Sequence, residues 1–123
     1  MKLIVAGGRD FTDTNLMIAE LQKLVNSGNI PEYPELVCGM AYGADLTAYN
    51  LWSGAGMVIH KFPADWARLG KCAGYKRNQE MGEFADAAVC FWDGNSKGTK
   101  HMIDIMNKLN KPVYIVRYYN TLS

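Results

Sequence analysis

Glycine is concentrated in three short segments whose composition suits the binding of an anion. The segments are Gly7-Gly8-Arg9-Asp10-Phe11, Gly39-Met40-Ala41-Tyr42-Gly43-Ala44-Asp45 and Asp93-Gly94-Asn95-Ser96-Lys97-Gly98-Thr99. Glycine lets a backbone approach a ligand closely and expose successive N–H groups, and a helix N-terminus adds partial positive charge. Each segment alone is explained equally well by a tight strand-to-helix turn. Three such segments on one edge of a fold favour a site for a phosphate or a carboxylate.

The candidate ligand-binding residues in these segments are the glycines and the polar or aromatic side chains between them. They are Gly7, Gly8, Arg9, Asp10, Gly39, Tyr42, Gly43, Asp45, Gly94, Ser96, Lys97, Gly98 and Thr99. Gly98 and Thr99 are the best candidates for phosphate binding, because a helix is expected to begin there.

Two of the charged residues have both a functional and a structural interpretation. The planar guanidinium of Arg9 could clamp a phosphate, although a surface ion pair with Asp10 or Asp13 is the alternative. Asp45 stands at an expected helix start, where it either accepts hydrogen bonds from ribose hydroxyls or caps the helix. We favour ligand binding over an ion pair for Arg9 and leave both interpretations open for Asp45.

Three aromatic side chains could stack on a base. They are Tyr42, Trp66 and Trp92, of which only Tyr42 and Trp92 lie within the glycine-rich segments. Aromatic residues beside strand ends more often pack in a core or at its rim.

The three segments differ from the familiar nucleotide-binding fingerprints. Gly7-Gly8 lacks the G-x-G-x-x-G spacing, and the second strand ends in Cys38-Gly39 without an acid to bind a ribose. Lys97 precedes the second glycine of its segment, whereas a Walker loop has its lysine after that glycine. We therefore expect neither NAD binding nor ATP hydrolysis, and no cofactor. His60 and His101 belong to no cluster with metal-ligand spacing, so we expect no metal.

The elements that must position these residues alternate between strand and helix. Short apolar runs predict strands over residues 2–6, 35–38, 57–62, 87–92 and 112–116. Helical spacing predicts helices over residues 13–27, 44–52, 75–84 and 99–109, with a longer polar loop opening at Pro63. The apolar stripe of the last helix consists of Met102, Ile105, Met106 and Leu109, which we interpret as a core stripe.

Apolar strands separated by helices predict a parallel sheet with right-handed crossovers. We expect an α/β fold, a Rossmann-like three-layer sandwich with a parallel five-stranded sheet and helices on both faces. The sequence has no internal repeat or linker, so we expect one domain over residues 1–123. Ligands of such sheets bind outside the carboxyl ends of the strands, where the three glycine-rich segments are expected.

Composition and charge limit the partners and the location. The formal net charge is +1, and the thirteen Lys and Arg residues are scattered, so nucleic acid is not an expected partner. The 49% of hydrophobic residues is typical of a globular protein. We expect a cytoplasmic protein without a membrane partner, because the chain has no apolar run long enough for a membrane span and starts in an apparent core strand. Cys38, Cys72 and Cys90 lack C-x-x-C spacing and best fit buried thiols in a reducing compartment.

Five motifs occur in order along the chain: A-G-G-R-D-F, G-x-A-x-G-A-D, F-P-A-D-W, G-Y-x-R-N-x-x-M and F-W-x-G-x-S-x-G-T-x-x-M-I. Together they resemble the YspA-type, cpYpsA-related family of the SLOG superfamily, over residues 4–116. That family is similar to the Smf DNA-processing proteins and to the lonely-guy phosphoribohydrolases. The resemblance implies a Rossmann-like domain that binds a nucleotide, a nucleoside or a related signalling molecule, often as a homo-oligomer. It adds Arg77 and Asn78 to the candidate ligand-binding residues, which polarity alone would place on a solvated helix face.

The resemblance to the lonely-guy enzymes is incomplete at the residues that do chemistry. In those enzymes an R-K-x-x-M segment and a P-G-G-x-G-T-x-x-E segment supply an arginine and a glutamate that cleave the N-glycosidic bond of a nucleoside monophosphate. Arg77 matches the arginine, and Asn78 replaces the lysine. Met102 stands where the resemblance places the glutamate, and a thioether can neither transfer a proton nor stabilise a cationic sugar.

Two functions are therefore compatible with the sequence. We predict a sensor or sequestering module, which binds a nucleotide-derived small molecule without turning it over. The alternative is a nucleotide-processing enzyme, an N-glycosidase or phosphoribohydrolase that cleaves a nucleoside monophosphate. Its candidate catalytic residues are Arg77, Glu80, Asp45 and Asp93. A DNA-binding accessory role, by analogy with the Smf proteins, is opposed by the near-neutral charge.

Overall fold

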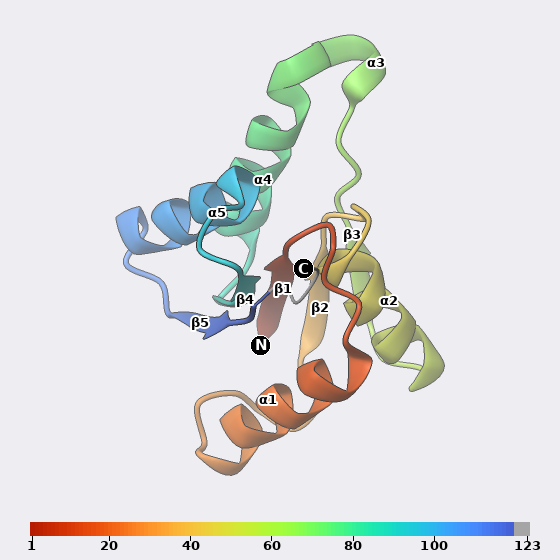
Figure 1. The fold of residues 1–123 in the computed structure, drawn as a ribbon, viewed down its shortest axis with the longest axis vertical. Coiled ribbons are helices and arrows are strands. Elements are labelled where there is room, and N and C mark those ends of the chain that lie inside the picture. The colour runs from red at the N-terminus through yellow and green to blue at the C-terminus, as the bar shows by residue number, and fades with distance from the viewer. Residues whose placement is uncertain (120–123) are drawn as a thin grey trace.

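The computed structural model describes residues 1–119, in which strands and helices alternate along the chain (Figure 1). The strands are β1 (Lys2–Gly7), β2 (Glu35–Cys38), β3 (Ile59–Lys61), β4 (Ala87–Trp92) and β5 (Val113–Arg117). The helices are α1 (Thr14–Asn26), α2 (Ala44–Gly54), α3 (Trp66–Leu69), the 3-10 turn η1 (Gly70–Cys72), α4 (Ala73–Phe84) and α5 (Lys97–Lys108). Within this described part, none of the helices combines the length and the apolar character needed to cross a bilayer.

The five strands form one sheet in the order β3-β2-β1-β4-β5, and every neighbouring pair is parallel. The central strand is β1, whose Ile4 is in register with Val37 of β2 and with Ala88 of β4. The chain adds strands on one side of β1 and then returns to add them on the other side. The predicted α/β Rossmann-like fold with a parallel five-stranded sheet is confirmed, and its strand order reverses between β1 and β4.

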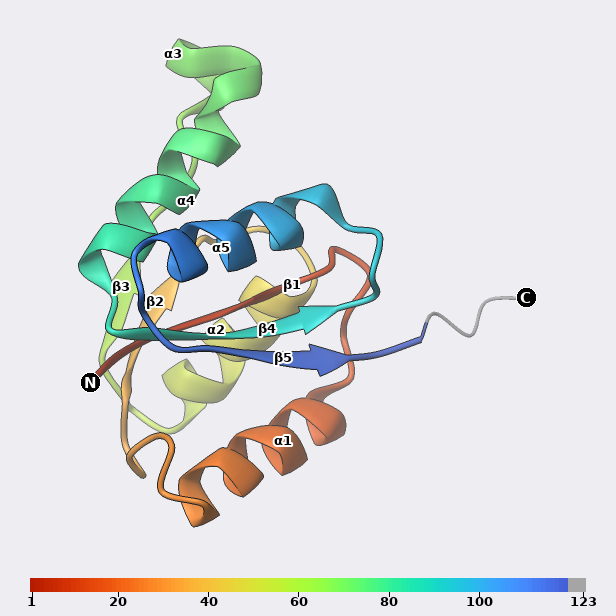
Figure 2. The same ribbon diagram turned by 90° about the vertical axis from the view of Figure 1, so that its left-hand side faces the viewer.

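Helices cover both faces of the sheet, α1 and α2 on one side and α4 and α5 on the other (Figure 2). Alternate residues of β1 belong to the two resulting cores. Leu3 and Val5 pack on the α1 and α2 side, and Ile4 and Ala6 pack on the α4 and α5 side. Both sets are apolar because each face of the strand is buried, as expected for a central parallel strand.

The structure differs from the sequence prediction mainly in the segment after β3. The polar loop predicted from Pro63 contains α3 and η1, and α4 begins at Ala73. Asp65 starts α3, because its side chain accepts a hydrogen bond from the backbone N–H of Arg68 at 3.2 Å. A four-residue helix with no buried residue carries no apolar stripe, so periodicity gives no signal for it. Figure 2 shows α3 at the tip of an arm that α4 extends away from the sheet.

Several element boundaries also differ from the prediction by one or two residues. β3 is limited to Ile59–Lys61, and β1 continues to Gly7. α5 begins at Lys97, earlier than the predicted residue 99, because Ser96 is its N-cap. The Ser96 Oγ accepts a hydrogen bond from the Thr99 N–H at 3.4 Å.

The C-terminal end of α4 is fixed by one lysine. The Nζ of Lys111 donates hydrogen bonds to the backbone oxygens of Gly82, Glu83 and Ala85, at 2.9, 2.9 and 2.7 Å. These carbonyls lie at or just beyond the last turn of the helix, where a cation is favoured by the helix dipole. The contact joins α4 to the segment that leads into β5.

The close packing of α4 on α5 generates a prediction at Gly82. A Cβ at this position would lie 2.5 Å from the Ile105 Cγ2 atom. Gly82→Ala is therefore expected to lower the free energy of unfolding by roughly 1–3 kcal/mol through overpacking. That figure is the net effect of the overpacking cost and the helix-propensity gain of about 1 kcal/mol that alanine brings, because the Ile105 contact is far shorter than van der Waals distance. Urea unfolding of the two proteins measures the difference.

Gly54→Ala is the matched control for this prediction. Gly54 is also helical, at the end of α2, but a Cβ there would have no atom within 4 Å. The control variant should be as stable as the wild type or slightly more stable. Equal stabilisation by the two substitutions would show that α4 and α5 pack less closely than described.

Candidate functional site

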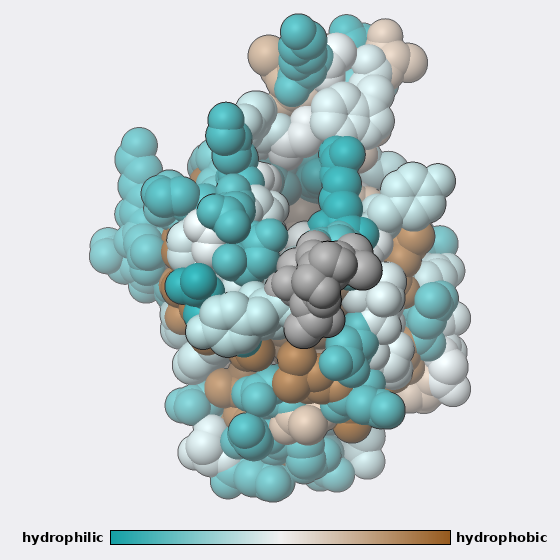
Figure 3. Space-filling model, in the orientation of Figure 1, coloured by the Kyte–Doolittle hydropathy of each residue, from teal (hydrophilic) through white to brown (hydrophobic). Residues whose placement is uncertain are grey.

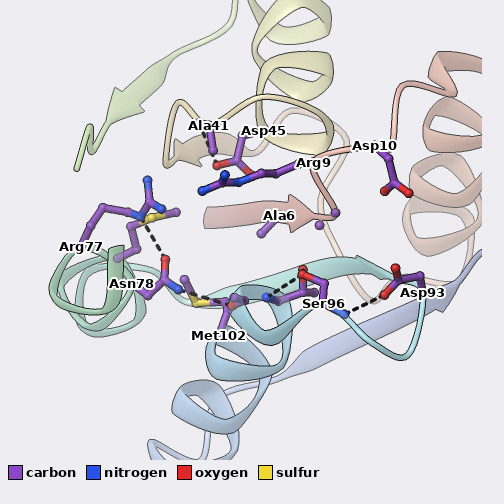
Figure 4. A pocket seen from close by; sticks show the side chains of 15 residues that line it. Ala6, Arg9, Asp10, Ala41, Asp45, Arg77, Asn78, Asp93, Ser96 and Met102 are labelled. Atoms are coloured by element: carbon purple, nitrogen blue, oxygen red, sulfur yellow. Dashed lines mark hydrogen bonds between the residues drawn. The ribbon is translucent and has the colours of Figure 1, made fainter. Parts of the chain in front are cut away.

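A pocket of about 460 Å³ lies at the carboxyl ends of β1 and β4, where the strand order reverses. Its walls come from the loop after β1, the start of α2, one face of α4 and the start of α5 (Figure 4). The lining residues are Ala6, Gly7, Gly8, Arg9, Asp10, Ala41, Asp45, Arg77, Asn78, Met81, Asp93, Ser96, Gly98, Thr99 and Met102. Open parallel sheets bind ligands at this point, and the volume lies in the usual range of small-molecule sites.

Figures 1 and 2 together show that the strands point toward the viewer of Figure 1, and Figure 3 shows this face of the molecule as largely hydrophilic. Hydrophobic residues on it occupy small areas between hydrophilic ones. A face of this kind suits a polar ligand better than a large apolar one.

Most of the predicted ligand-binding residues line this pocket. They are Gly7, Gly8, Arg9, Asp10, Asp45, Arg77, Asn78, Ser96, Gly98 and Thr99. The sequence reasoning did not place Ala6, Ala41, Met81 and Met102 there. Met81 follows Arg77 at the i+4 position of α4, so helical periodicity would have placed both residues on the same face.

Two predicted residues, Gly39 and Tyr42, belong instead to a neighbouring pocket of about 550 Å³. That pocket shares Arg9, Ala41 and Arg77 with the first one. Gly39 leaves room for charged groups, since a Cβ there would lie 2.8 Å from the Arg77 Nη1 atom.

The remaining predicted residues, Gly43, Gly94 and Lys97, do not line either pocket. Gly43 is the N-cap of α2 with a φ of 87°, and a Cβ there would collide with the backbone oxygen of Gly8. A Cβ at Gly94, whose φ is 89°, would collide with the Arg117 guanidinium. Lys97 is exposed at the start of α5. The tight-turn interpretation therefore accounts for the two glycines.

Arg77 is held in place by two hydrogen bonds at the junction of the two pockets. Its Nη1 donates to the backbone oxygen of Gly39, and its Nε donates to the Asn78 Oδ1 at 3.0 Å. Burial lowers the pKa of Arg77, the Asp45 carboxylate opposes this effect, and Arg9 adds to it. The side chain is partly buried, so the solvated-face interpretation is wrong for Arg77.

Asn78 joins α4 to α5 beside the pocket. Its Nδ2 donates to the backbone oxygen of Gly98 at 3.4 Å and lies 3.2 Å from the His101 Nδ1. Because its Oδ1 accepts from Arg77, Asn78 connects the arginine to the start of α5. The amide can make this connection with one donor and one acceptor, which a lysine at this position could not do.

Asp45 is a buried carboxyl group on the pocket wall, with 7% of its surface exposed. Its Oδ2 accepts a hydrogen bond from the Ala41 N–H at 3.3 Å. Burial raises the pKa of Asp45 to about 6, although the Ala41 hydrogen bond and the charge of Arg77 act in the opposite direction. The helix-cap interpretation is wrong for this residue, because Gly43 is the N-cap of α2 and Asp45 lies in the first turn.

The other candidate catalytic acids are less suited to proton transfer. The Asp93 Oδ1 accepts hydrogen bonds from the backbone N–H groups of Ser96 and Asn95, both at 2.8 Å, and these bonds lower the pKa of Asp93. Asp93 lines the pocket but stabilises the turn before α5. Glu80 is exposed on α4 and does not line the pocket.

The Met102 side chain lies in the core and also lines the pocket. It is 1% exposed and belongs to the core between the sheet and α4 and α5, which confirms the core stripe. It also lines the pocket, close to the N-terminal turn of α5. The position that holds a glutamate in the lonely-guy motif therefore presents a thioether to the pocket.

The three aromatic candidates differ in their contacts. The Nε1 of Trp92 donates to the Ser96 backbone oxygen at 3.1 Å, and the Arg117 guanidinium lies 5.4 Å from the centre of its ring. These contacts support the packing interpretation of Trp92 over base stacking. Tyr42 and Trp66 are exposed, and both line the neighbouring pocket.

Comparison with known proteins gives one match. A family model described as YspA, cpYpsA-related SLOG family matches residues 1–69. No curated protein and no solved structure matches the chain. The matched residues include the loop after β1 and the start of α2, which supply Arg9 and Asp45 to the pocket.

Replacing Asp45 with asparagine is expected to stabilise the fold above about pH 6. The folded-state pKa of about 6 lies above the ordinary value of 3.8, so ionising the buried group opposes folding. This penalty is absent below the ordinary pKa, grows as the pH rises to about 6 and then stays constant. At about 1.4 kcal/mol per pKa unit, the variant should gain roughly 2–3 kcal/mol relative to the wild type between pH 4 and pH 8.

Urea unfolding of both proteins at those two pH values measures this gain. The asparagine oxygen can still accept the Ala41 N–H, so the comparison isolates the charge. A variant that is less stable than the wild type at the higher pH would contradict the unfavourable burial of the Asp45 carboxylate.

Met102→Glu is expected to destabilise the protein at neutral pH by roughly 2–5 kcal/mol, because a carboxyl group would replace a packed thioether. Met102→Leu conserves the volume and should cost less than about 1.5 kcal/mol. Thermal and urea unfolding of the two variants give the comparison. An unchanged melting temperature for Met102→Glu would mean that this side chain faces open solvent in the pocket.

Proposed function

Because the chain belongs to the YspA, cpYpsA-related SLOG family, we propose that it binds a nucleotide or nucleotide-derived small molecule in the pocket at the carboxyl edge of its sheet. It acts as a sensor or sequestering module, which holds the ligand without turning it over. The observation that carries this proposal is the pair of arginines, Arg9 and Arg77, which line one pocket beside a helix N-terminus.

The two arginines favour an anionic group in the ligand. Their like charges act on each other, since Arg9 lowers the pKa of Arg77. A phosphate between them would relieve this repulsion and accept charge-assisted hydrogen bonds from both guanidinium groups. Gly98 in the first turn of α5 also lines the pocket, and a helix N-terminus stabilises negative charge.

The opposite end of the pocket favours hydroxyl groups. Asp10 and Asp93 stand there, away from Arg77, as Figure 4 shows. A carboxylate oxygen accepts hydrogen bonds from hydroxyl groups, as Asp10 does from the Tyr118 hydroxyl at 2.6 Å. A cationic end and a hydroxyl-accepting end together suit a sugar phosphate, which is the shared part of all nucleotides.

Binding without turnover is supported by the groups around the expected glycosidic bond. Met102 replaces the glutamate of the lonely-guy motif, Asp93 is engaged by backbone N–H groups and Glu80 lies outside the pocket. Met102 and Glu80 therefore supply no carboxylate for an oxocarbenium-like transition state, and the Asp93 carboxylate stands at the end of the pocket away from Arg77.

One observation favours the enzyme alternative, an N-glycosidase that acts on a nucleoside monophosphate. Asp45 is buried on the pocket wall, and its pKa of about 6 lies near the pH at which an acid or base works best. A perturbed carboxyl group beside an arginine in a pocket is a common feature of catalytic sites. In this alternative Asp45 supplies the carboxyl group and Arg77 holds the phosphate or sugar.

Arg9→Ala is expected to weaken the binding of a nucleoside monophosphate by roughly 10- to 100-fold, because a charged hydrogen bond contributes about 1.5–3 kcal/mol. A thermal-shift screen of the nucleoside monophosphates and cyclic nucleotides selects the ligand, and isothermal titration calorimetry measures its affinity. The melting temperature of the free protein should not change, since Arg9 is exposed.

Arg68→Ala is the control for Arg9. Arg68 is also an exposed arginine, but it pairs with Asp65, the N-cap of α3, and lines neither pocket. Its substitution should leave the affinity unchanged. If Arg9→Ala binds the ligand as tightly as Arg68→Ala does, Arg9 does not contact the ligand.

Turnover is tested by incubating the wild-type protein with the same ligand and analysing the mixture by mass spectrometry. Recovery of the intact ligand supports the binding module. The release of a free base and a sugar phosphate would establish the enzyme, and Asp45→Asn should then abolish this release.

A further inference from the structure

The first pocket and the neighbouring, second pocket meet at two arginines, Arg9 and Arg77. Arg9, Ala41 and Arg77 line both cavities, whose volumes are about 460 and 550 Å³. Figure 4 shows the Arg9 side chain extending beside Asp45 in the direction of Arg77. Each cavity alone has the volume of a small-molecule site, so the two together exceed what a mononucleotide fills.

The second pocket differs from the first in its chemistry. Tyr42 and Trp66 line it with 78% and 51% of their surface exposed. They come from separate parts of the chain, the loop after β2 and the short helix α3. Two exposed aromatic rings in one cavity offer flat apolar surfaces on which a heteroaromatic group can stack.

The position of the Trp66 ring relative to Arg77 is set by a glycine of α4. A Cβ at Gly74 would lie 3.2 Å from the Trp66 Cη2 atom and 3.9 Å from the Arg77 Nη2 atom. The indole ring and the guanidinium therefore lie against the same point of α4. A ligand that contacts both groups would place an anionic group directly beside an aromatic one.

We infer that the two pockets bind the two halves of one ligand, a dinucleotide-type molecule other than NAD in which a phosphate or diphosphate joins two nucleoside-like parts. NAD itself is not expected, because the glycine-rich segments lack the G-x-G-x-x-G fingerprint. This inference rests on the proposed function and specifies its ligand class. The anionic linkage lies at Arg9 and Arg77, which face both cavities. One sugar occupies the first pocket, and the base of the second half stacks on Tyr42 and Trp66.

The inference is tested by comparing two ligand sets in calorimetry, the nucleoside monophosphates and the symmetric dinucleoside diphosphates made from them. At least one dinucleoside diphosphate should bind 10-fold or more tightly than its monophosphate. Tyr42→Ala should weaken the binding of that dinucleoside diphosphate by roughly 5- to 100-fold, the range expected for one base–aromatic stack. The same variant should change the monophosphate affinity by less than about 2-fold, because the first pocket is intact.

Tyr33→Ala is the matched control. Tyr33 is 75% exposed, like Tyr42, but it precedes β2 at the opposite edge of the sheet and lines neither pocket. Its substitution should affect neither ligand set. Both variants remove an exposed side chain, and an unchanged melting temperature verifies that they fold.

The outcomes separate this inference from the proposed function. The inference of a two-part ligand is overturned if the monophosphates bind as tightly as the dinucleoside diphosphates. It is also overturned if Tyr42→Ala changes the affinity for both ligand sets equally. In either case the proposed function stands. Failure of every nucleotide in both sets to bind would overturn both. Tighter binding of a dinucleoside diphosphate that Tyr42→Ala removes would support both.

Discussion

The central strand β1 has no polar face, and the rest of the structure follows from that constraint. Its residues are buried on both sides, so helices must cover both faces of the sheet. Parallel strands joined by right-handed crossovers can achieve this only if the chain adds strands on one side of β1 and later on the other. The loops after β1 and β4 then diverge toward opposite faces. The pocket is the space left between them, and it is where Arg9 and the start of α5 meet.

The features that depend on continuous apolar runs and on glycine could be predicted from the sequence. The five strands, four of the helices and the parallel sheet were predicted, and so were the loops that line the pocket. α3 was not, because its four residues bury nothing and a single aspartate cap is a weak signal. The tight turns at Gly43 and Gly94 have the same sequence signature as a binding loop, since both uses require a positive φ or close approach.

The candidate site shows a second limit of the sequence. Arg77 was predicted as a ligand-binding residue only through the family resemblance. The reason is that a polar helix face has no periodic feature that distinguishes a pocket residue from a solvated one. Burial raises the pKa of Asp45, and Arg77 and Ala41, which reach it from another helix and from the preceding loop, act in the opposite direction. Such electrostatic coupling is a property of the assembled fold. A buried carboxyl group whose charge opposes folding is more easily explained by function than by stability.

The tip of the arm, which α3 and η1 form, makes the local stability of the binding surface uneven. Neither element contains a buried residue, and α3 ends at Gly70 with a φ of 57°. Segments with few buried contacts open at a small fraction of the global unfolding free energy. Opening of this arm removes the Trp66 wall of the second pocket and leaves the first pocket, built on β1 and α5, in place. The two cavities therefore differ in local stability, because the first is built on core elements and one wall of the second is built on a segment without buried residues.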